Sequence, residues 1–181
     1  MTSELDVARL DAIVQGVVDR LQGDWLLIGG ALVALWFDSR RVTEDVDLIG
    51  IGGTGADRLA LLGLAVDLGL PVEALNSAAD YFVSRIPGWR SDIELFRTGR
   101  AGRVFRPSPT LFLLLKLPRL STRDLQDCLE LLGRCARDGL TVDRPRVVVR
   151  LAALPPANDA PLADRRRQLR AAIDRAPAAG G

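Results

Sequence analysis

Apolar and polar residues follow two different spacings along the first part of the chain. In some segments apolar side chains return every three or four positions, as on one buried face of a helix, whereas in others they alternate or form short runs, as in strands. Glycines and polar turns separate these segments. The pattern predicts helix 4–22, strand 25–28, helix 31–37, strand 42–49, helix 56–69, strand 71–75 and a hairpin of 81–86 with 92–96.

After Arg97 a glycine-containing loop is expected, and from there on only helical spacing remains. Ser108-Pro109 combines a capping residue with a proline in the first turn. We therefore expect an α/β (α+β) fold, with a short mixed sheet flanked by helices in residues 1–106 and a helical subdomain over 107–155. A linker, a basic helix and a flexible tail are expected over 156–181. The helices expected here are 109–117, 121–138, 144–154 and 162–175.

Composition narrows the possible functions. The chain has 181 residues, of which 48% are hydrophobic and 26% charged, enough for the core of one domain, and its net charge of +1 excludes a strongly basic nucleic-acid coat. It has no histidine, which excludes Ser-His-Asp and Cys-His nucleophile systems and, with two cysteines, argues against zinc. Catalysis must then use carboxylates and hence a hard metal ion. The cysteines, Cys128 and Cys135, are expected as small core residues.

Two features bear on the location of the chain. The longest apolar run, Trp25–Phe37, is shorter than the roughly 20 residues of a membrane span. No segment has the pattern of a signal peptide, and two cysteines are too few for a disulfide framework. We expect a cytoplasmic protein without a membrane partner.

Two aspartates fall in the strand predicted at 42–49. Asp45 and Asp47 (the aspartate pair) are two positions apart, so an extended strand would direct both side chains to one face, about 6.5–7 Å apart. Neighbouring carboxylates repel each other unless a cation lies between them. Upstream, Gly29 and Gly30 (the glycine pair) expose backbone N–H groups at a helix start, which is a phosphate-binding geometry. Together the two pairs predict a metal–nucleotide site.

A third acidic position is expected from the strand at 92–96. Asp92 and Glu94 would share one face of that strand. If this strand lies beside the one that carries the aspartate pair, one of these acids completes a triad that holds two magnesium ions about 3.5–4 Å apart. Alternatively, both acids form the solvated face of an edge strand. The sequence does not decide between Asp92 and Glu94.

The glycine pair followed by Arg41-Val-Thr43-Glu-Asp45-Val-Asp47-Leu resembles the signature of the nucleotidyltransferase superfamily, which has a DNA-polymerase-β-like palm. The similarity is to its small bacterial members, the minimal nucleotidyltransferases and the toxins of toxin–antitoxin and abortive-infection systems. It implies transfer of a nucleoside monophosphate from an NTP with Mg²⁺ (or Mn²⁺) to a hydroxyl of RNA (tRNA) or of a protein. Pyrophosphate leaves, and a cognate toxin or antitoxin is an implied partner.

The resemblance also implies roles for individual residues. The glycine pair would contact the triphosphate, and the aspartate pair would hold the metal ions. Arg41 and Thr43 would orient the strand of the aspartate pair or its ligand, or else stabilise a turn. The implied catalytic residues are Asp45, Asp47, Asp92 and Glu94; the implied metal ligands are Asp45, Asp47 and Glu94; and the implied nucleotide-binding residues are Gly29, Gly30, Arg41, Thr43, Lys116, Asp124 and Asp127.

The helical part contains the single lysine of the chain, Lys116, among 24 lysines and arginines. The toxin branch has a lysine on a later helix, followed by a basic residue and aspartate, which Lys116 and Arg123-Asp124-Leu125-Gln126-Asp127 resemble. The resemblance implies that this lysine meets the β- and γ-phosphates as a point charge. Alternatively, its ammonium extends from an apolar helix to solvent, and the Arg123–Asp127 segment is an ordinary helix start.

Two other functions are open. Gly50, Gly52 and Gly55 match G-x-G-x-x-G between a strand and a helix, the context of a dinucleotide-binding oxidoreductase. We disfavour it because the preceding strand carries the aspartate pair and the helical second half offers too few βαβ units. The other alternative is a nucleotidyltransferase-fold binding module with weak activity, one half of a toxin–antitoxin pair.

Two groups of arginines are candidates for following an RNA backbone, or else are solvated surface charge. They are Arg97, Arg100, Arg103 and Arg106 in the first group, and Arg165, Arg166, Arg167 and Arg170 in the second.

Overall fold

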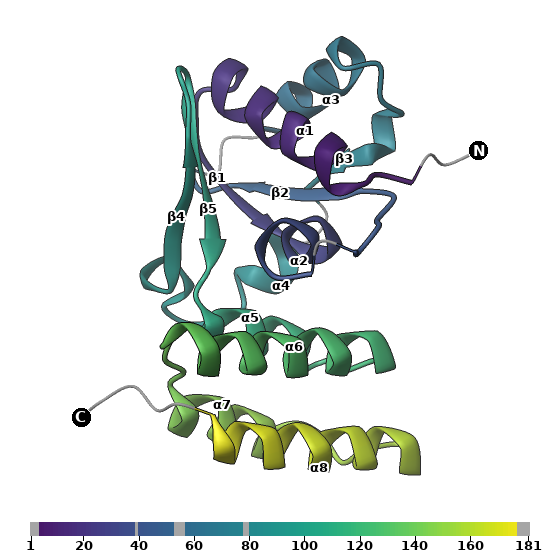
Figure 1. Cartoon of the computed structure of the whole chain (residues 1–181), viewed down its shortest axis with the longest axis vertical. Helices are drawn as coiled ribbons and strands as arrows, with labels where there is room; N and C mark the ends of the chain where they lie inside the picture. Colours follow the sequence, from purple (N-terminus) through teal and green to yellow (C-terminus); the bar gives the residue numbers. More distant parts are fainter. Residues whose placement is uncertain (1–3, 39, 53–56, 78–79, 177–181) are drawn as a thin grey trace. The chain divides into compact units, whose positions relative to one another are not determined.

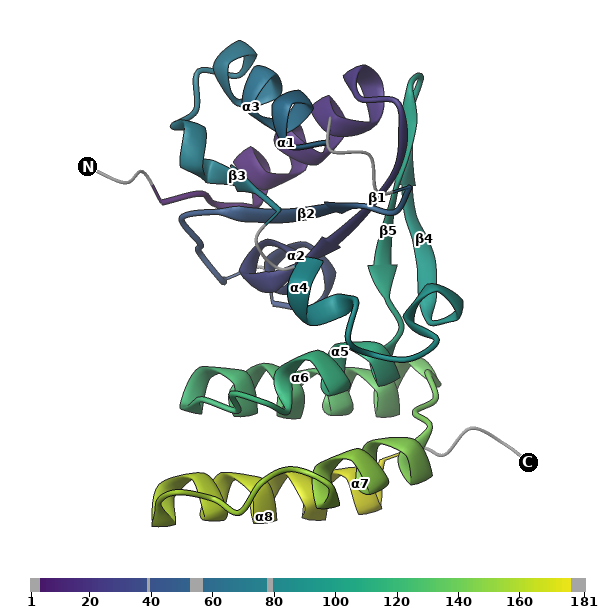
Figure 2. The same cartoon turned by 180° about the vertical axis from the view of Figure 1, so that it is seen from behind.

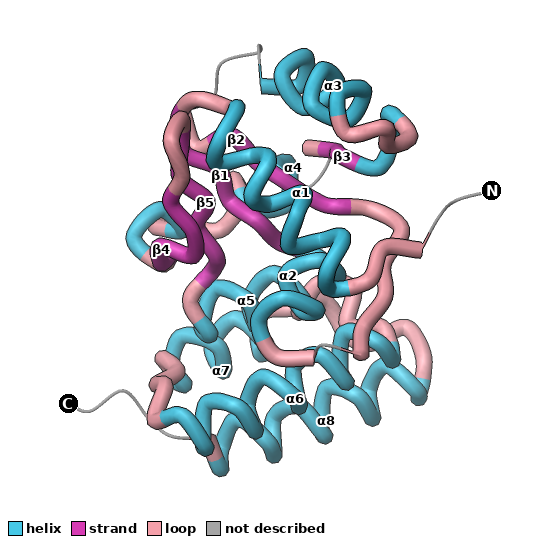
Figure 3. Tube along the Cα trace, turned by 45° about the horizontal axis from the view of Figure 1, so that its top comes forward, coloured by secondary structure: helices cyan, strands magenta, loops and turns pink. Residues whose placement is uncertain are grey.

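The computed structural model describes residues 4–38, 40–52, 57–77 and 80–176. The chain divides into two compact units, Met1–Pro107 and Ser108–Gly181. The first combines a mixed five-stranded sheet with helices, whereas the described part of the second is helical, as the colours of Figure 3 show. The expected mixed α/β class is confirmed at this level, and the change of character falls one residue from the predicted position.

The first unit begins with the predicted alternation of helices and strands. Its elements are α1 (Val7–Arg20), β1 (Gly23–Ile28), α2 (Gly29–Trp36), β2 (Val46–Gly50), α3 (Asp57–Asp67), η1 (Val72–Ala74), β3 (Leu75–Asn76), α4 (Asp80–Val83), η2 (Trp89–Ser91), β4 (Ile93–Thr98) and β5 (Gly102–Pro107). Asp6 caps α1 by accepting a hydrogen bond from the backbone N–H of Arg9. In Figure 1, α1 and α3 lie above β2, and α2 and α4 lie below it.

The order of the strands determines which side chains meet. It is β3-β2-β1-β5-β4, so β3 and β4 are the two edges of the sheet (Figure 2). β1 pairs antiparallel with β2 and parallel with β5. It is the central strand of the sheet and is largely buried, which explains its continuous run of apolar residues. The register places Asp47 opposite Ile28 of β1 on one side and opposite Asn76 of β3 on the other. The start of α2 therefore lies beside the aspartate of β2.

The predicted hairpin of 81–86 with 92–96 is wrong. Residues 80–83 form the short helix α4, and β4 pairs instead with β5. In β5, Val104 is fully buried, whereas Arg103 and Arg106 on either side of it are not. The glycine and arginines of this segment conceal the strand pattern in the sequence. The loop expected between Arg97 and Arg106 is thus a β-hairpin. The strand expected at 71–75 is largely the turn η1, followed by the two-residue β3.

The second unit contains α5 (Pro109–Lys116), α6 (Thr122–Asp138), α7 (Arg144–Ala152) and α8 (Ala160–Arg175). Ser108 and Ser121 cap the first two helices, as the sequence predicts. α8 contacts both α6 and α7, and its residues Leu169 and Ile173 are fully buried. This helix therefore belongs to the core of the helical unit. None of the helices in the described ranges is both long and apolar enough to cross a bilayer.

Candidate metal–nucleotide site

The glycine pair lies where β1 ends and α2 begins. Gly29 has a left-handed backbone, with φ of +73°, which disfavours any side chain. A β-carbon at position 29 would collide with the carboxylate of Asp47, and one at position 30 would lie 2.8 Å from Thr43 Oγ1. Space and backbone both require glycine at position 29. The N-terminus of α2 therefore stands directly against Asp47 and Thr43.

The aspartate pair reaches this helix start from β2 and from the loop before it. β2 begins at Val46, so Asp45 precedes the strand instead of lying within it. Both aspartates are half-buried. One oxygen of Asp45 accepts a hydrogen bond from Thr43 Oγ1 at 3.2 Å and the other from Asn76 Nδ2 at 3.4 Å. These two donors orient the Asp45 carboxylate.

Asn76 is a site residue that the sequence analysis missed. The parallel pairing of β3 with β2 places it beside Asp47, and its amide donates to Asp45. In the sequence it is an amide residue following Ala74 and Leu75, near the carboxyl end of a predicted strand, where binding residues of open sheets collect. Only the pairing of the strands identifies it, and that pairing joins segments far apart in the chain.

Arg41 and Thr43 lie in the loop between α2 and β2. Thr43 forms two backbone hydrogen bonds with Leu5. The Leu5 N–H donates to the Thr43 carbonyl at 2.7 Å, and the Thr43 N–H donates to the Leu5 carbonyl at 3.4 Å. Arg41 Nε lies 3.9 Å from the position that a β-carbon would occupy on Gly30. The positive charge of a guanidinium therefore lies beside the glycine pair.

Glu94 of β4 does not join this group, and Asp92 lies just before β4, at the end of η2, instead of within the strand. β1 and β5 separate β4 from β2, which amounts to about 14 Å over three strand spacings. Glu94 pairs with Arg106 at 2.5 Å, and the Arg106 guanidinium carbon lies 3.9 Å from the centre of the Trp36 ring. The alternative in which the strand of Glu94 lies beside the aspartate pair is wrong, and β4 is an edge strand, as the other alternative expects. Strand order is set by long-range pairing, which the alternation of residues 92–96 does not encode.

The aspartate pair fits a magnesium ion that takes its remaining ligands from a nucleotide. Among the described residues, no three acidic, cysteine or histidine side chains are grouped so that they could form an all-protein metal site. Mg²⁺ usually uses one or two carboxylates and completes its shell with phosphate oxygens and water. The two half-buried carboxylates of the aspartate pair provide that donor chemistry. They lie beside the start of α2, where an added β-carbon would collide with Asp47.

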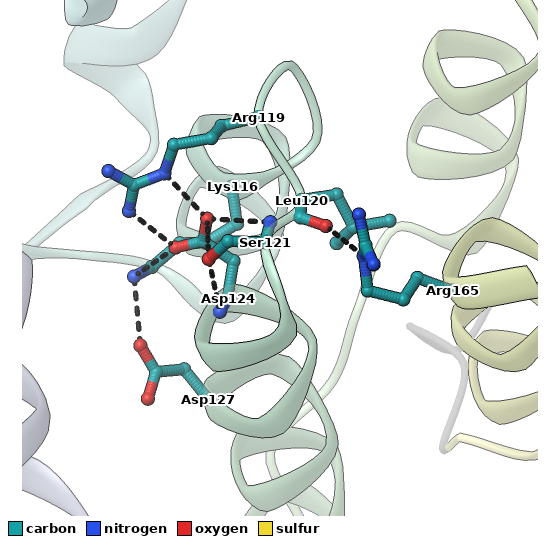
Figure 4. Close-up of polar contacts among 7 residues, drawn as sticks. All are labelled: Lys116, Arg119, Leu120, Ser121, Asp124, Asp127 and Arg165. Carbon is teal, nitrogen blue, oxygen red and sulfur yellow. Dashed lines mark hydrogen bonds and ion pairs between the residues drawn. The ribbon is translucent and has the colours of Figure 1, made fainter. Parts of the chain in front are cut away.

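In the helical unit, Lys116 lies between two buried aspartates (Figure 4). Its Nζ donates to Asp124 Oδ1 at 3.0 Å and to Asp127 Oδ2 at 2.9 Å. The Lys116 side chain is 14% exposed, whereas that of Asp124 is 1% exposed. The grouping of Lys116 with both aspartates is thus present. The exposed Arg123 is not part of it, and Arg119, which the sequence analysis did not single out, supplies the second cation.

Asp124 is the centre of this Lys116 network (Lys116, Arg119, Ser121, Asp124 and Asp127). Arg119 donates to it from two nitrogens at 2.7 and 2.8 Å, and Ser121 donates from its backbone N–H at 3.0 Å and its hydroxyl at 2.8 Å. Burial alone would raise the pKa of Asp124. The hydrogen bond from Arg119, the charge of Lys116 and the hydrogen bond from Ser121 outweigh burial, so this pKa lies well below the ordinary range of aspartate.

The cysteines are buried free thiols on α6, as expected of small core residues. Burial raises the pKa of the Cys128 thiol, which keeps it protonated and unreactive.

Most of the arginines in the two groups have partners within their own unit. In the first group, Arg97 pairs with Asp11, Arg103 with Asp24 and Arg106 with Glu94, and the Arg100 backbone N–H donates to Asp19. In the second group, Arg167 pairs with Asp164 and Arg170 with Asp174, while Arg165 and Arg166 donate to the carbonyls of Leu120 and Pro155.

The glycine fingerprint is described only in part. Gly50 ends β2 and Gly52 lies in the following turn, whereas Gly55 lies outside the described residues. β2 and β3 are parallel, but β3 has two residues and the other neighbour of β2 is antiparallel. A dinucleotide-binding sheet is built from several parallel strands around the binding crevice. Among the described strands, β2 has one short parallel neighbour, β3, and the other parallel pair of the sheet, β1 with β5, does not include β2.

No protein-family model, curated protein or solved structure matches this chain. The functional conclusion is therefore carried by the arrangement of the side chains.

Proposed function

We propose that this chain is a metal-dependent nucleotidyltransferase that moves a nucleoside monophosphate from an NTP to a hydroxyl of RNA or protein. The proposal is supported by one observation, the approach of Asp47 and Thr43 to the glycine pair at the start of α2. A helix N-terminus suits phosphate oxygens, and carboxylates suit Mg²⁺. Both components of a magnesium–NTP complex thus find complementary groups at one position.

In the proposed reaction, the acceptor oxygen forms a bond to the α-phosphorus while the bond from that phosphorus to pyrophosphate breaks. The glycine pair admits the phosphates, and Arg41 supplies counter-charge. The aspartate pair would hold the divalent cation, which when bound neutralises phosphate charge. Because the chain has no histidine, the proton of the acceptor hydroxyl passes to a carboxylate or to water.

We assign a separate phosphate-binding role to Lys116 in the helical unit. Asp124 and Asp127 hold the ammonium in place and accept two of its three N–H donors, and the third is the donor assigned to a phosphate oxygen. Because the chain has a single lysine, an amine-acetylating reagent reports on this side chain by peptide mapping. Mg–ATP should slow acetylation of Lys116 at least fivefold, and an unchanged rate would exclude this phosphate-binding role of Lys116.

The transfer is tested with each of the four α-labelled NTPs, Mg²⁺ and a cell extract. Label should appear on RNA or protein and disappear with EDTA. The Asp45→Asn/Asp47→Asn variant should lose both transfer and metal-dependent NTP binding in titration calorimetry. Asp67→Asn, at an aspartate of α3 whose side chain is 64% exposed, should retain both. Metal-dependent binding that persists in the double variant would exclude the proposed site.

A nucleotide-binding module with little transferase activity, acting with a cognate toxin or antitoxin, is the second candidate. It is favoured by the placement of Glu94 in β4, three positions from the strand of Asp47 in the sheet, where it pairs with Arg106 of β5 and does not complete a triad. Magnesium-dependent NTP binding without transfer of label to any fraction of the extract would support the module over the enzyme.

A further inference from the structure

The turn between α5 and α6 contains an unusual backbone conformation. Leu120 is the one non-glycine residue in the described part of the chain with a positive φ, of +35°. Its side chain is fully buried, and its N–H donates to the carbonyl of Lys116 at 2.9 Å. Side chains disfavour this backbone region, so such a conformation persists only where neighbouring contacts hold it.

One of those contacts comes from the C-terminal helix. Arg165 of α8 donates from Nε to the carbonyl of Leu120 at 2.7 Å (Figure 4). Arg165 is half-buried, and α8 is anchored beside it by the fully buried Leu169. In contrast, Arg167 on the same helix pairs with its near neighbour Asp164. Arg165 therefore ties a helix forty-five positions along the chain to the Leu120 turn.

The direction of the chain at Leu120 determines the geometry around Asp124. The residues on either side of Leu120, Arg119 and Ser121, both donate to the Asp124 carboxylate. The same carboxylate accepts the hydrogen bond from Lys116. A change in the Leu120 turn would move two donors of Asp124 at once and would release one side of the lysine.

We propose that Arg165 is a positioning residue for Lys116, acting through the Leu120 turn and Asp124. The inference rests on the proposed function, in which the Lys116 ammonium binds phosphate. In this proposal α8 holds the Lys116 ammonium in the position in which it contacts the nucleotide.

The test compares Arg165→Met, which removes the donor and keeps the aliphatic stem, with Arg167→Met as the matched control on α8. Without nucleotide, acetylation of Lys116 should be at least fivefold faster in Arg165→Met and unchanged in Arg167→Met. If transfer activity is present, the KM for NTP should rise about tenfold while kcat changes less than threefold. Equal acetylation rates in Arg165→Met and wild type would overturn the proposal.

Two further variants separate positioning from general loss of stability. Arg165→Gln keeps an N–H donor and should stay within twofold of wild type in acetylation. Val147→Ala truncates a fully buried side chain of α7 and should destabilise the same unit without exposing Lys116. If Val147→Ala accelerates acetylation as much as Arg165→Met at the same loss of thermal stability, the effect is structural and the proposal is wrong.

The acetylation readout also distinguishes this inference from the proposed function. Faster labelling in Arg165→Met, combined with no protection of the wild type by Mg–ATP, would retain the positioning of Lys116 and reject its phosphate-binding role. Protection by Mg–ATP with no effect of Arg165→Met would do the reverse.

Discussion

Replacing Asp124 by asparagine removes the central charge of the Lys116 network with little change of shape. Asp124 accepts hydrogen bonds from Lys116, Arg119 and Ser121 on its two oxygens. An amide has one oxygen and an NH₂ group, so at least one of these donors would then face another donor. The substitution also weakens the capping box in which Ser121 and Asp124 bind each other's backbone N–H.

The magnitude follows from the exposure of each partner. Removing one member of a buried ion pair costs about 3–5 kcal/mol, and losing a cap costs about 1 kcal/mol. Arg119, with a side chain that is 76% exposed, returns to water at little cost, and Lys116 keeps its contact with Asp127 at 2.9 Å. We therefore expect Asp124→Asn to lower the free energy of unfolding by about 3 kcal/mol, near the lower limit for a buried pair.

The assay is urea and thermal unfolding followed by circular dichroism of the helical signal. The matched control is Asp138→Asn on the same helix, where Asp138 pairs with Arg134 and its side chain is 37% exposed. A surface pair of this kind contributes about 0–1 kcal/mol. The loss in Lys116→Met/Asp124→Asn should be smaller than the sum of the single losses, because the two groups are coupled. Equal losses in Asp124→Asn and Asp138→Asn would refute the reasoning.

Three further predictions concern the glycine at the start of α2, the acid on the edge strand β4, and the pH dependence of Asp124. Gly29→Ala should abolish metal-dependent NTP binding in calorimetry, because its β-carbon meets Asp47, whereas Gly63→Ala on the exposed face of α3 should raise stability by about 1 kcal/mol. Glu94→Gln should leave that binding unchanged and cost under about 1 kcal/mol in unfolding, since the Glu94 side chain is 43% exposed. Because the pKa of Asp124 is lowered in the folded chain, the ionised carboxylate contributes fully to folding stability above the ordinary aspartate value of 3.8. That contribution is lost as the pH falls below this value, so the thermal stability of Asp124→Asn should depend less on pH there than that of the wild type.

Local signals in the sequence predicted the elements whose ends are set by nearby residues. Ser121 begins α6 and Gly139 ends it with φ of +69°, as a cap and a terminating glycine dictate. The glycine pair and the aspartate pair also meet as expected, because a short helix and loop connect adjacent antiparallel strands. In each case the interacting residues lie close together in the chain.

Features that depend on long-range pairing were not predicted. The partner of β4 is β5 instead of residues 81–86, and β4 lies at the far edge of the sheet from Asn76. Alternation of apolar and polar residues identifies a strand but says nothing about its neighbour. For the same reason Glu94 was placed near the aspartate pair, and Asn76 was overlooked although its amide binds Asp45.

The geometry of the Lys116 network explains why a chain that otherwise relies on arginine keeps a lysine here. Arg119 binds a single carboxylate with two nitrogens, at 2.7 and 2.8 Å, which is the side-on geometry of a planar guanidinium. Lys116 instead divides its donors between the carboxylates of Asp124 and Asp127, on successive turns of α6, with its Nζ 5.4 Å from the centre of the Phe112 ring. A compact ammonium satisfies two separate carboxylates in this space, whereas a guanidinium would favour one of them and displace the other. Arginine at position 116 would therefore preserve the charge of the network and lose its geometry.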